Sequence, residues 1–265
     1  MIIDFHTHVF PDRLAPRAVA ALERSSGETA VLQATADALR ASMREAGIDY
    51  ALNLPIATKP EQTESINRFA EQVNGTQGLL SFGSVHPLCE DWRGALRRIR
   101  DAGLKGIKLH LDFQGLFVDD PRVVEVICEA GRLGLIVILH GGMDVSFRDL
   151  HRCTPERLTH ILPDVRGTTL VIAHMGGYDY LDDVEKYLLR SELYIDTSAT
   201  FGRSDEKQVA RILRSFHPDR ILFGSDSPWF GQRRTLDALR SLRLPEALER
   251  KILGENAARL LGIDR

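Results

Sequence analysis

Short apolar runs rich in β-forming residues alternate with longer segments of helical period along the whole chain. The short runs predict eight strands, over Ile2–His8, Tyr50–Leu54, Leu80–Val85, Gly106–Leu109, Ile136–Leu139, Leu170–Ala173, Leu193–Asp196 and Ile221–Phe223. The segments between them predict helices, among them Asp37–Ala46, Glu61–Val73, Trp92–Ala102, Pro121–Leu133, Asp182–Arg190 and Glu206–Phe216.

This alternation predicts a closed α/β barrel. A repeat of strand, helix and strand implies parallel strands with right-handed crossovers, and eight units favour a (β/α)8 (TIM) barrel over an open doubly wound sheet. No Gly-x-Gly-x-x-Gly follows the first strand, which weakens the dinucleotide-binding alternative. The connection after the first strand is long, and Leu14–Arg24 within it predicts an extra helix over the barrel mouth. We expect a single domain over residues 1–265.

Composition narrows the class of protein without changing this fold. Of the 265 residues, 43% are hydrophobic and 27% are charged, which excludes a mainly disordered chain. The formal net charge of −3 offers no positive excess for nucleic acid or an anionic membrane. The chain meets an acid at Asp4, unlike a signal peptide, and no apolar run approaches the roughly 18 residues of a spanning helix. We expect a cytoplasmic protein with a small-molecule substrate, and homo-oligomerisation is left open.

Histidines and one aspartate stand where the predicted strands end. The first strand ends in His6 and His8, while His110, His140 and His174 follow the fourth, fifth and sixth strands and Asp226 follows the eighth. In a parallel barrel these ends gather at one rim, the carboxyl-terminal face where active sites of this fold lie. We therefore expect these side chains to converge.

The His6-x-His8 pair is the sharpest local pattern. Side chains alternate along a strand, so the two imidazoles are expected on one side, where they can share a cation. By itself the pair also fits two structural histidines on a half-buried strand. Combined with His140, His174 and Asp226, it offers nitrogen and carboxylate ligands that suit a divalent cation such as Zn²⁺.

Five motifs occur in the order seen in the amidohydrolase superfamily, which the chain resembles over essentially its whole length. They are Asp4-Phe-His-Thr-His, Gly106-Ile-Lys-Leu-His, Leu139-His-Gly-Gly, Ala173-His-Met-Gly-Gly and Phe223-Gly-Ser-Asp-Ser-Pro-Trp. Within the superfamily the chain resembles the amidohydrolase-related branch, which includes aminocarboxymuconate-semialdehyde decarboxylase and resorcylate decarboxylases. The resemblance is specific for the superfamily and much less so for one reaction.

The resemblance implies a role for each of these residues. His6, His8, His140 and Asp226 would bind one divalent ion, with Zn²⁺ as the first choice. His174 would be the catalytic histidine near the metal-bound water, and in some relatives the equivalent residue binds a second metal. A bound metal lowers the pKa of water from about 16 toward 7, and Asp226 can accept the released proton as a general base.

Lys108, at the end of the fourth predicted strand, has three interpretations. Binuclear members of the superfamily place a bridging carboxylated lysine or glutamate here; an ammonium could instead pair with Asp226 as a structural contact, or anchor a substrate carboxylate. We favour the last. His110 would share the inward side two residues later, as a contact to substrate or to a ligand. Trp229 and Phe230 follow Asp226 and are candidates for the pocket wall.

These residues favour a metal-dependent hydrolase of a small amide, lactone or ester. The main alternative is a non-oxidative decarboxylase of an aromatic or unsaturated acid, which the branch resemblance supports and the short chain opposes. A TatD-like nuclease is disfavoured by Lys108, where such enzymes have a metal-binding glutamate, and by the slightly acidic charge. A non-catalytic metal-binding barrel is the non-enzyme alternative; a missing ligand position would favour it, and every expected position is filled.

Overall fold

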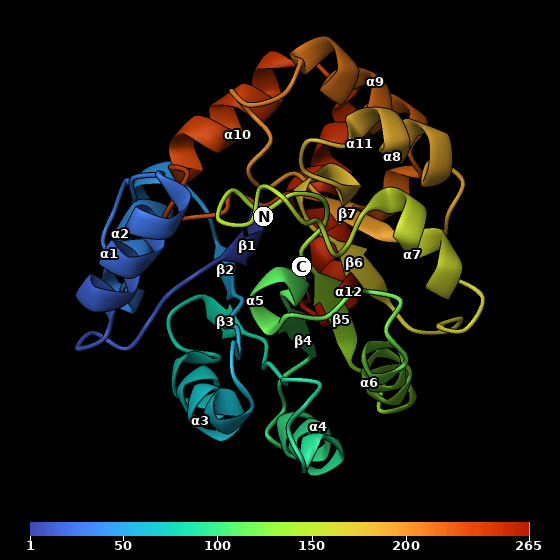
Figure 1. Ribbon diagram of the computed structural model, residues 1–265. Coiled ribbons are helices and arrows are strands. Elements are labelled where there is room, and N and C mark those ends of the chain that lie inside the picture. Colours follow the sequence, from blue (N-terminus) through green and yellow to red (C-terminus); the bar gives the residue numbers. More distant parts are fainter. Residues whose placement is uncertain (265) are drawn as a thin grey trace.

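A ring of parallel strands surrounded by helices forms the centre of the computed structural model, which describes residues 1–264 (Figure 1). The strands are β1 (Ile3–Thr7), β2 (Tyr50–Asn53), β3 (Leu79–Ser81), β4 (Gly106–Leu109), β5 (Ile136–Leu139), β6 (Leu170–Ile172), β7 (Tyr194–Asp196) and β8 (Ile221–Leu222). All of the predicted strands are present. The third is shorter than predicted, because regular pairing with β2 ends at Ser81.

The strands pair in chain order, as a TIM barrel requires. One sheet runs β1-β2-β3 and the other β4-β5-β6-β7-β8, and every pair is parallel. Backbone hydrogen bonds close the ring at both gaps, among them one from Lys108 to the Gly83 carbonyl (2.9 Å) and one from Phe5 to the Phe223 carbonyl (2.8 Å). A side chain at position 83 would collide with Ile99 at 2.8 Å, so the first closure needs glycine there. The predicted barrel is confirmed.

The helices are α1 (Ala15–Ser26), α2 (Ala36–Ala46), α3 (Thr63–Val73), α4 (Trp92–Asp101), α5 (Leu111–Gln114), α6 (Pro121–Arg132), α7 (Pro155–Ile161), α8 (Leu181–Tyr187), α9 (Glu206–Ser215), α10 (Gln232–Ser241), α11 (Glu246–Arg250) and α12 (Asn256–Leu261). Most of them surround the ring, whereas α5 and α12 overlap its centre in Figure 1. The six named predicted helices are confirmed, and local chemistry explains their ends. The Thr35 hydroxyl caps α2 and the Asp120 carboxylate caps α6, each accepting from a first-turn N–H.

The core has two layers that follow the alternation of each strand. In β5, Val137 and Leu139 pack outward in the same apolar cluster as Val126 of α6. The alternate residues Ile136 and Ile138 belong to a separate inner cluster. Continuing that alternation places the residue at position 140 on the inner side, at the carboxyl end of the barrel.

The extra helix predicted between the first two strands is present as α1. A proline in its first turn starts it, and Gly27 ends it in the left-handed conformation with φ 76°. Leu22 and Ser26 of this helix line a pocket at the barrel mouth, as the prediction required. Within residues 1–264, no helix combines the length and apolar character needed to cross a membrane.

Candidate metal centre and active site

A pocket opens at the carboxyl ends of the strands and contains every site residue predicted from the sequence. Its empty volume is about 900 Å³ including the open mouth. The predicted residues that line it are His6, His8, Lys108, His110, His140, His174 and Asp226. The polar groups therefore converge from β1, β4, β5, β6 and β8, as the barrel geometry predicts.

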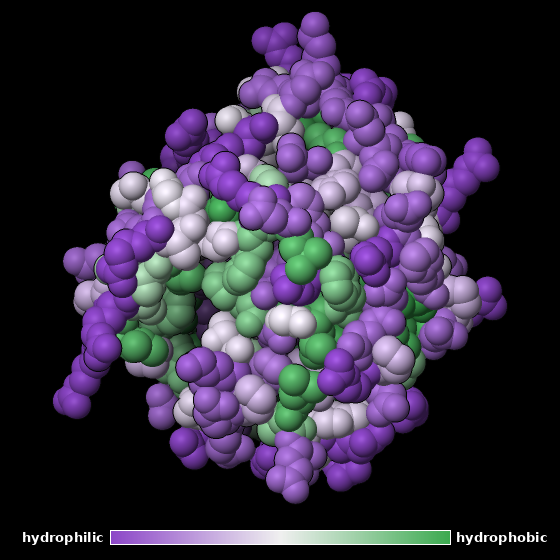
Figure 2. Space-filling model, in the orientation of Figure 1, coloured by the Kyte–Doolittle hydropathy of each residue, from purple (hydrophilic) through white to green (hydrophobic). Residues whose placement is uncertain are grey.

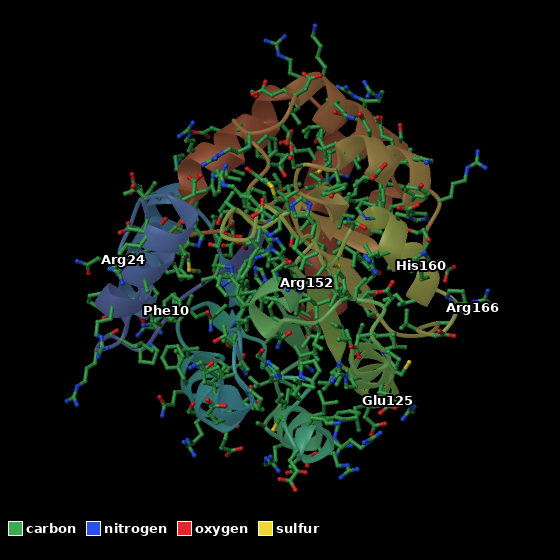
Figure 3. All side chains as sticks on the ribbon, viewed as in Figure 1. Phe10, Arg24, Glu125, Arg152, His160 and Arg166 are labelled. Atoms are coloured by element: carbon green, nitrogen blue, oxygen red, sulfur yellow. The ribbon has the colours of Figure 1, made fainter. Side chains whose placement is uncertain are left out.

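The upper walls of this pocket are mainly apolar. Hydrophobic side chains surround a hollow beside α1 in the space-filling view (Figure 2). Phe10, which lies beside α1 in Figure 3, contributes to the wall together with Phe113, and the predicted wall residues Trp229 and Phe230 line it as well. An apolar cleft over a few convergent polar groups is the usual form of a small-molecule site.

His6, His8 and Asp226 form one of three groups of possible metal ligands in the described residues; the other two are His6 with His174 and Asp196, and His110 with His140 and Asp144. Asp226 Oδ1 lies 3.4 Å from His6 Nε2 and 3.2 Å from His8 Nε2. The Asp226 backbone has φ 70°, and its N–H donates to the His6 carbonyl at 2.9 Å, which brings the end of β8 against the end of β1. The two histidines reach the same carboxylate oxygen, as their spacing predicts.

The hydrogen bonds made by the Nδ1 atoms of His6 and His8 determine which nitrogen of each imidazole is free to accept. His8 Nδ1 lies 2.9 Å from the Leu54 carbonyl, which can only accept, so Nδ1 carries the proton. His6 Nδ1 lies 2.8 Å from a carboxylate oxygen of Asp196. Both Nε2 atoms are left as acceptors facing Asp226, and burial lowers the pKa of His6 well below its usual value. Neutral, oriented imidazoles beside a carboxylate fit a divalent cation.

His140 and His174 form the next group along the rim. His140 Nδ1 lies 3.0 Å from His174 Nε2, while His140 Nε2 lies 3.1 Å from the Met143 carbonyl. Burial lowers the pKa of both imidazoles well below the usual value. Of the four predicted ligands, His6 and His8 are therefore grouped around Asp226, and His140 lies next to His174 instead. The role of His140 as the fourth ligand stays a prediction.

Asp196 and Ser198, at the end of β7, hold two of these histidines in place and were not predicted. Asp196 receives the His6 Nδ1–H and also accepts the His174 backbone N–H at 3.1 Å. The Ser198 hydroxyl lies 3.0 Å from His6 Nδ1, 2.9 Å from His174 Nδ1 and in contact with Asp196. His174 needs such support, because its backbone is left-handed with φ 59°. The sequence did offer one signal for Asp196: it is an acidic residue at the end of a buried strand, on the same rim as the predicted histidines.

Replacing Asp196 by asparagine is expected to weaken metal binding about 10- to 100-fold, the usual cost of losing the partner of a metal-ligating histidine. The neutral amide is a weaker acceptor than the carboxylate for the His6 Nδ1–H. Metal affinity, measured by competition with a chelator on folded variant, is the readout. Asp101→Asn, an exposed position at the end of α4, is the matched control. Equal affinities for the two variants would remove Asp196 from this role.

Lys108 brings a buried positive charge to the base of the pocket. Its side chain is 1% exposed, and Nζ has no hydrogen-bond partner among residues 1–264. Burial lowers its pKa to about 8, opposed by the charges of Asp196 and Asp226, so the ammonium form persists at neutral pH. The direct pairing with Asp226, one of the three interpretations, is not seen. A buried cation of this kind needs an anion, which a substrate carboxylate would provide.

His110 and Asp144 form a hydrogen-bonded pair at the pocket wall. His110 Nε2 lies 3.1 Å from Asp144 Oδ2, and the hydrogen bond and charge of His110 lower the pKa of Asp144 despite its burial. The His110 ring stacks on His140, with centroids 4.0 Å apart and planes at 16°. Ligand atoms of His110, His140 and Asp144, one from each residue, lie within 4.8 Å of one another, so this group is a further set of possible metal ligands. Asp144, on the loop after β5, was missed by the sequence analysis.

Comparisons with known proteins agree with this architecture. The amidohydrolase family profile matches residues 3–263. A search of curated proteins finds no match. Many solved structures share the fold, and three are described below.

One is 5-carboxyvanillate decarboxylase from Sphingomonas paucimobilis, with a TM-score of 0.72 and 17% identity over 100% of this chain and 99% of that chain. A dihydroxybenzoic acid decarboxylase from Polaromonas, with bound manganese and 2-nitroresorcinol, gives 0.69 and 16% over 100% and 97%. A probable 2-pyrone-4,6-dicarboxylic acid hydrolase from Acinetobacter baumannii gives 0.65 and 18% over 99% of each chain. At these identities the structures establish the fold, whereas the profile match over nearly the whole chain establishes the family: this protein belongs to the amidohydrolase family.

Proposed function

We propose that this protein is a metal-dependent, non-oxidative decarboxylase of a small aromatic or unsaturated acid. The observation that carries the proposal is the buried ammonium of Lys108 beside the histidine and aspartate cluster, at the base of a pocket with aromatic walls. Such a site offers a cation for a carboxylate and an apolar slot for a flat ring. Decarboxylases of substituted benzoates are among the similar structures, which supports the proposal.

A hydrolase, favoured by the sequence alone, would use the same centre. The main objection to a decarboxylase was the short chain; an alignment that covers 99% of 5-carboxyvanillate decarboxylase weakens that objection and supports the proposal. The probable 2-pyrone-4,6-dicarboxylic acid hydrolase keeps ring-opening of a lactone acid as the second candidate. Both reactions begin with an anionic ring compound. The decarboxylase would release carbon dioxide from it, whereas the hydrolase would add water across a ring bond.

His6, His8 and Asp226, with His140 as the predicted fourth ligand, would hold the divalent ion. When bound, it would supply positive charge that holds the substrate oxygens and stabilises the negative charge developing in the ring. Lys108 would bind the carboxylate through a charge-assisted hydrogen bond. The carbon–carboxyl bond then breaks, carbon dioxide leaves, and the electron pair stays on the ring carbon, which must take up one proton.

We assign delivery of that proton to Asp226. Its side chain is 13% exposed and lines the pocket, so it can exchange protons with solvent and still reach the substrate. His174 is buried, which lowers its pKa well below the usual value and favours the neutral imidazole, and we assign it a hydrogen bond that orients the substrate. The aromatic walls exclude water from the ring carbon, which limits competing hydrolysis.

A substrate panel tests this function directly. Metal-free protein is loaded with zinc or manganese and offered hydroxybenzoates, an unsaturated carboxylic acid, lactones and simple esters. We expect carbon dioxide release from at least one acid and no comparable hydrolysis. Ring-opened or cleaved products without carbon dioxide would support the hydrolase instead, and an inactive protein with tightly bound metal would support a non-catalytic barrel.

Replacing Lys108 by methionine is expected to weaken binding of benzoate about 10- to 100-fold, the scale of one hydrogen bond to a charged group. Binding of benzamide, a neutral analogue of similar shape, should change far less. Calorimetry on the metal-loaded variant measures both affinities, and Lys105→Met, at an exposed position before β4, is the control.

The other interpretations of Lys108 give different results in the same experiment. If Lys108 is carboxylated and bridges two ions, the methionine variant loses metal. Equal losses of affinity for the charged and the neutral ligand, with metal content unchanged, would contradict the role as a carboxylate anchor.

A further inference from the structure

An ion pair spans the mouth of the pocket. Glu28, on the loop after α1, contacts the Arg203 guanidinium, on the loop after β7, and both side chains line the pocket. They are about one-third exposed, at 30% and 35% respectively. The pair therefore connects two loops that are distant in sequence, and both of its members line the pocket.

Arg203 is well satisfied, in contrast to Lys108. Its guanidinium lies over the Phe230 ring at 5.5 Å and interacts with the hydroxyl of Tyr178 as well as with Glu28. Glu28 itself is held by its backbone N–H, which donates to Ser26 at 3.1 Å. The one pocket-lining cation at the rim is thus already neutralised within the described chain, whereas the cation at the base is not.

We infer that Glu28 makes the site selective for monocarboxylates, by occupying the guanidinium of Arg203 that would otherwise bind a second acidic group of the substrate. The inference rests on the proposed function only in that Lys108 takes the first carboxylate. A dicarboxylate entering this pocket places its outer carboxylate beside Glu28, where like charges repel. A monocarboxylate presents an uncharged edge to the same position and meets no such penalty.

Selectivity of this kind is a difference between two affinities, and repulsion of the wrong ligand contributes as much as attraction of the right one. A glutamine at position 28 keeps the size of the side chain and removes its charge. The Arg203 guanidinium is then free to bind a carboxylate of the substrate through two parallel hydrogen bonds. The substitution should therefore act on dicarboxylates and depend on Arg203.

Calorimetry on metal-loaded protein tests the inference with benzoate, benzene-1,3-dicarboxylate and benzene-1,4-dicarboxylate. The two dicarboxylates differ in the distance between their carboxylates. They therefore test two possible separations between Lys108 at the base of the pocket and Arg203 at its rim. We expect the wild type to prefer benzoate. Glu28→Gln should raise the affinity of at least one dicarboxylate relative to benzoate by about tenfold or more, as one hydrogen bond between charged groups contributes.

Two further variants make the outcome specific. Adding Arg203→Gln to Glu28→Gln should abolish the gain, and Glu23→Gln, on α1 outside the pocket lining, should leave the ratio of affinities unchanged. A wild type that prefers a dicarboxylate, or a Glu28→Gln variant with an unchanged ratio while benzoate still binds, overturns the role of Glu28 alone. Failure of benzoate to bind the wild type overturns this role and the carboxylate pocket of the proposed function together.

Discussion

A His6→Ala variant is expected to lose its divalent ion and essentially all turnover. His6 directs its Nε2 lone pair at the Asp226 carboxylate and is buried, so water can fill its place only poorly. Loss of an outer partner of a ligating histidine already costs about 10- to 100-fold in affinity or activity, and loss of the ligand itself should exceed that. Elemental analysis and kcat measured on the same preparation provide the readouts.

The exposed histidine of α7 offers a matched control for this experiment. His160 pairs with Asp119 at the surface, away from the pocket, and His160→Ala should retain both metal and activity. A His6→Ala protein that holds its metal as tightly as the His160 variant would remove His6 from the ligand set. Because His6 packs in the barrel, circular dichroism should show that the variant is folded before its metal content is interpreted.

His174→Ala is expected to keep most of the metal and lower kcat by about 100-fold or more, the scale of losing an acid–base or hydrogen-bonding group at a reacting centre. His174 has no contact with Asp226 among the interactions of the described residues, and its Nε2 faces His140 at 3.0 Å. Its removal should therefore disturb the orientation of the substrate more than the binding of the ion. Metal analysis and steady-state kinetics separate these effects.

Loss of metal from the His174→Ala variant would give His174 a different role. If His174→Ala loses metal as completely as His6→Ala, His174 is a ligand. A stoichiometry near two ions per chain in the wild-type protein would give the same answer. The short distance between His140 and His174 would then mark the second position, and Lys108 would become the candidate bridge.

The barrel could be predicted from the sequence because its strands and helices carry distinct periods. β5 reads as a short apolar run, and α6 begins at a proline behind a capping aspartate, so both have local causes. The third strand was predicted too long, because residues 82–85 stay extended beside β4, through the bridge between Gly83 and Ile107, but leave the regular ladder with β2 after Ser81. The helices α10 to α12 follow β8 without an intervening strand, and the alternation alone did not reveal them.

Site residues could be predicted only where a polar residue stands at the end of an apolar strand, where such a residue is unexpected. Histidines at strand ends are conspicuous, and all of the predicted positions line one pocket. Asp196 and Asp144 were missed because their significance comes from contacts with His6 and His110, which are 190 and 34 positions away in the chain. The Glu28–Arg203 pair lies on two loops, where charged residues are common and carry no pattern.

The choice between hydrolysis and decarboxylation could not be made from strand-end residues, because both reactions use the same imidazoles and carboxylates. What distinguishes the two reactions is which groups of the substrate the pocket binds. Lys108, buried without a partner among residues 1–264, favours an anion at the base of the pocket, and the aromatic walls favour a ring above it. These features became visible only when the fold brought β4 and the loop after β8 together.

The most direct test of the account follows the substrate carboxyl carbon and the proton that replaces it. A hydroxybenzoate with an isotopically labelled carboxyl group is incubated in heavy water with metal-loaded enzyme, and gas and product are analysed by mass spectrometry. We expect labelled carbon dioxide and a product that carries one deuterium at the carbon from which the carboxyl group left, with both signals absent from metal-free protein and from Asp226→Asn. Turnover of ring lactones or esters by the same preparation, with every labelled acid left intact, would contradict the proposed decarboxylation.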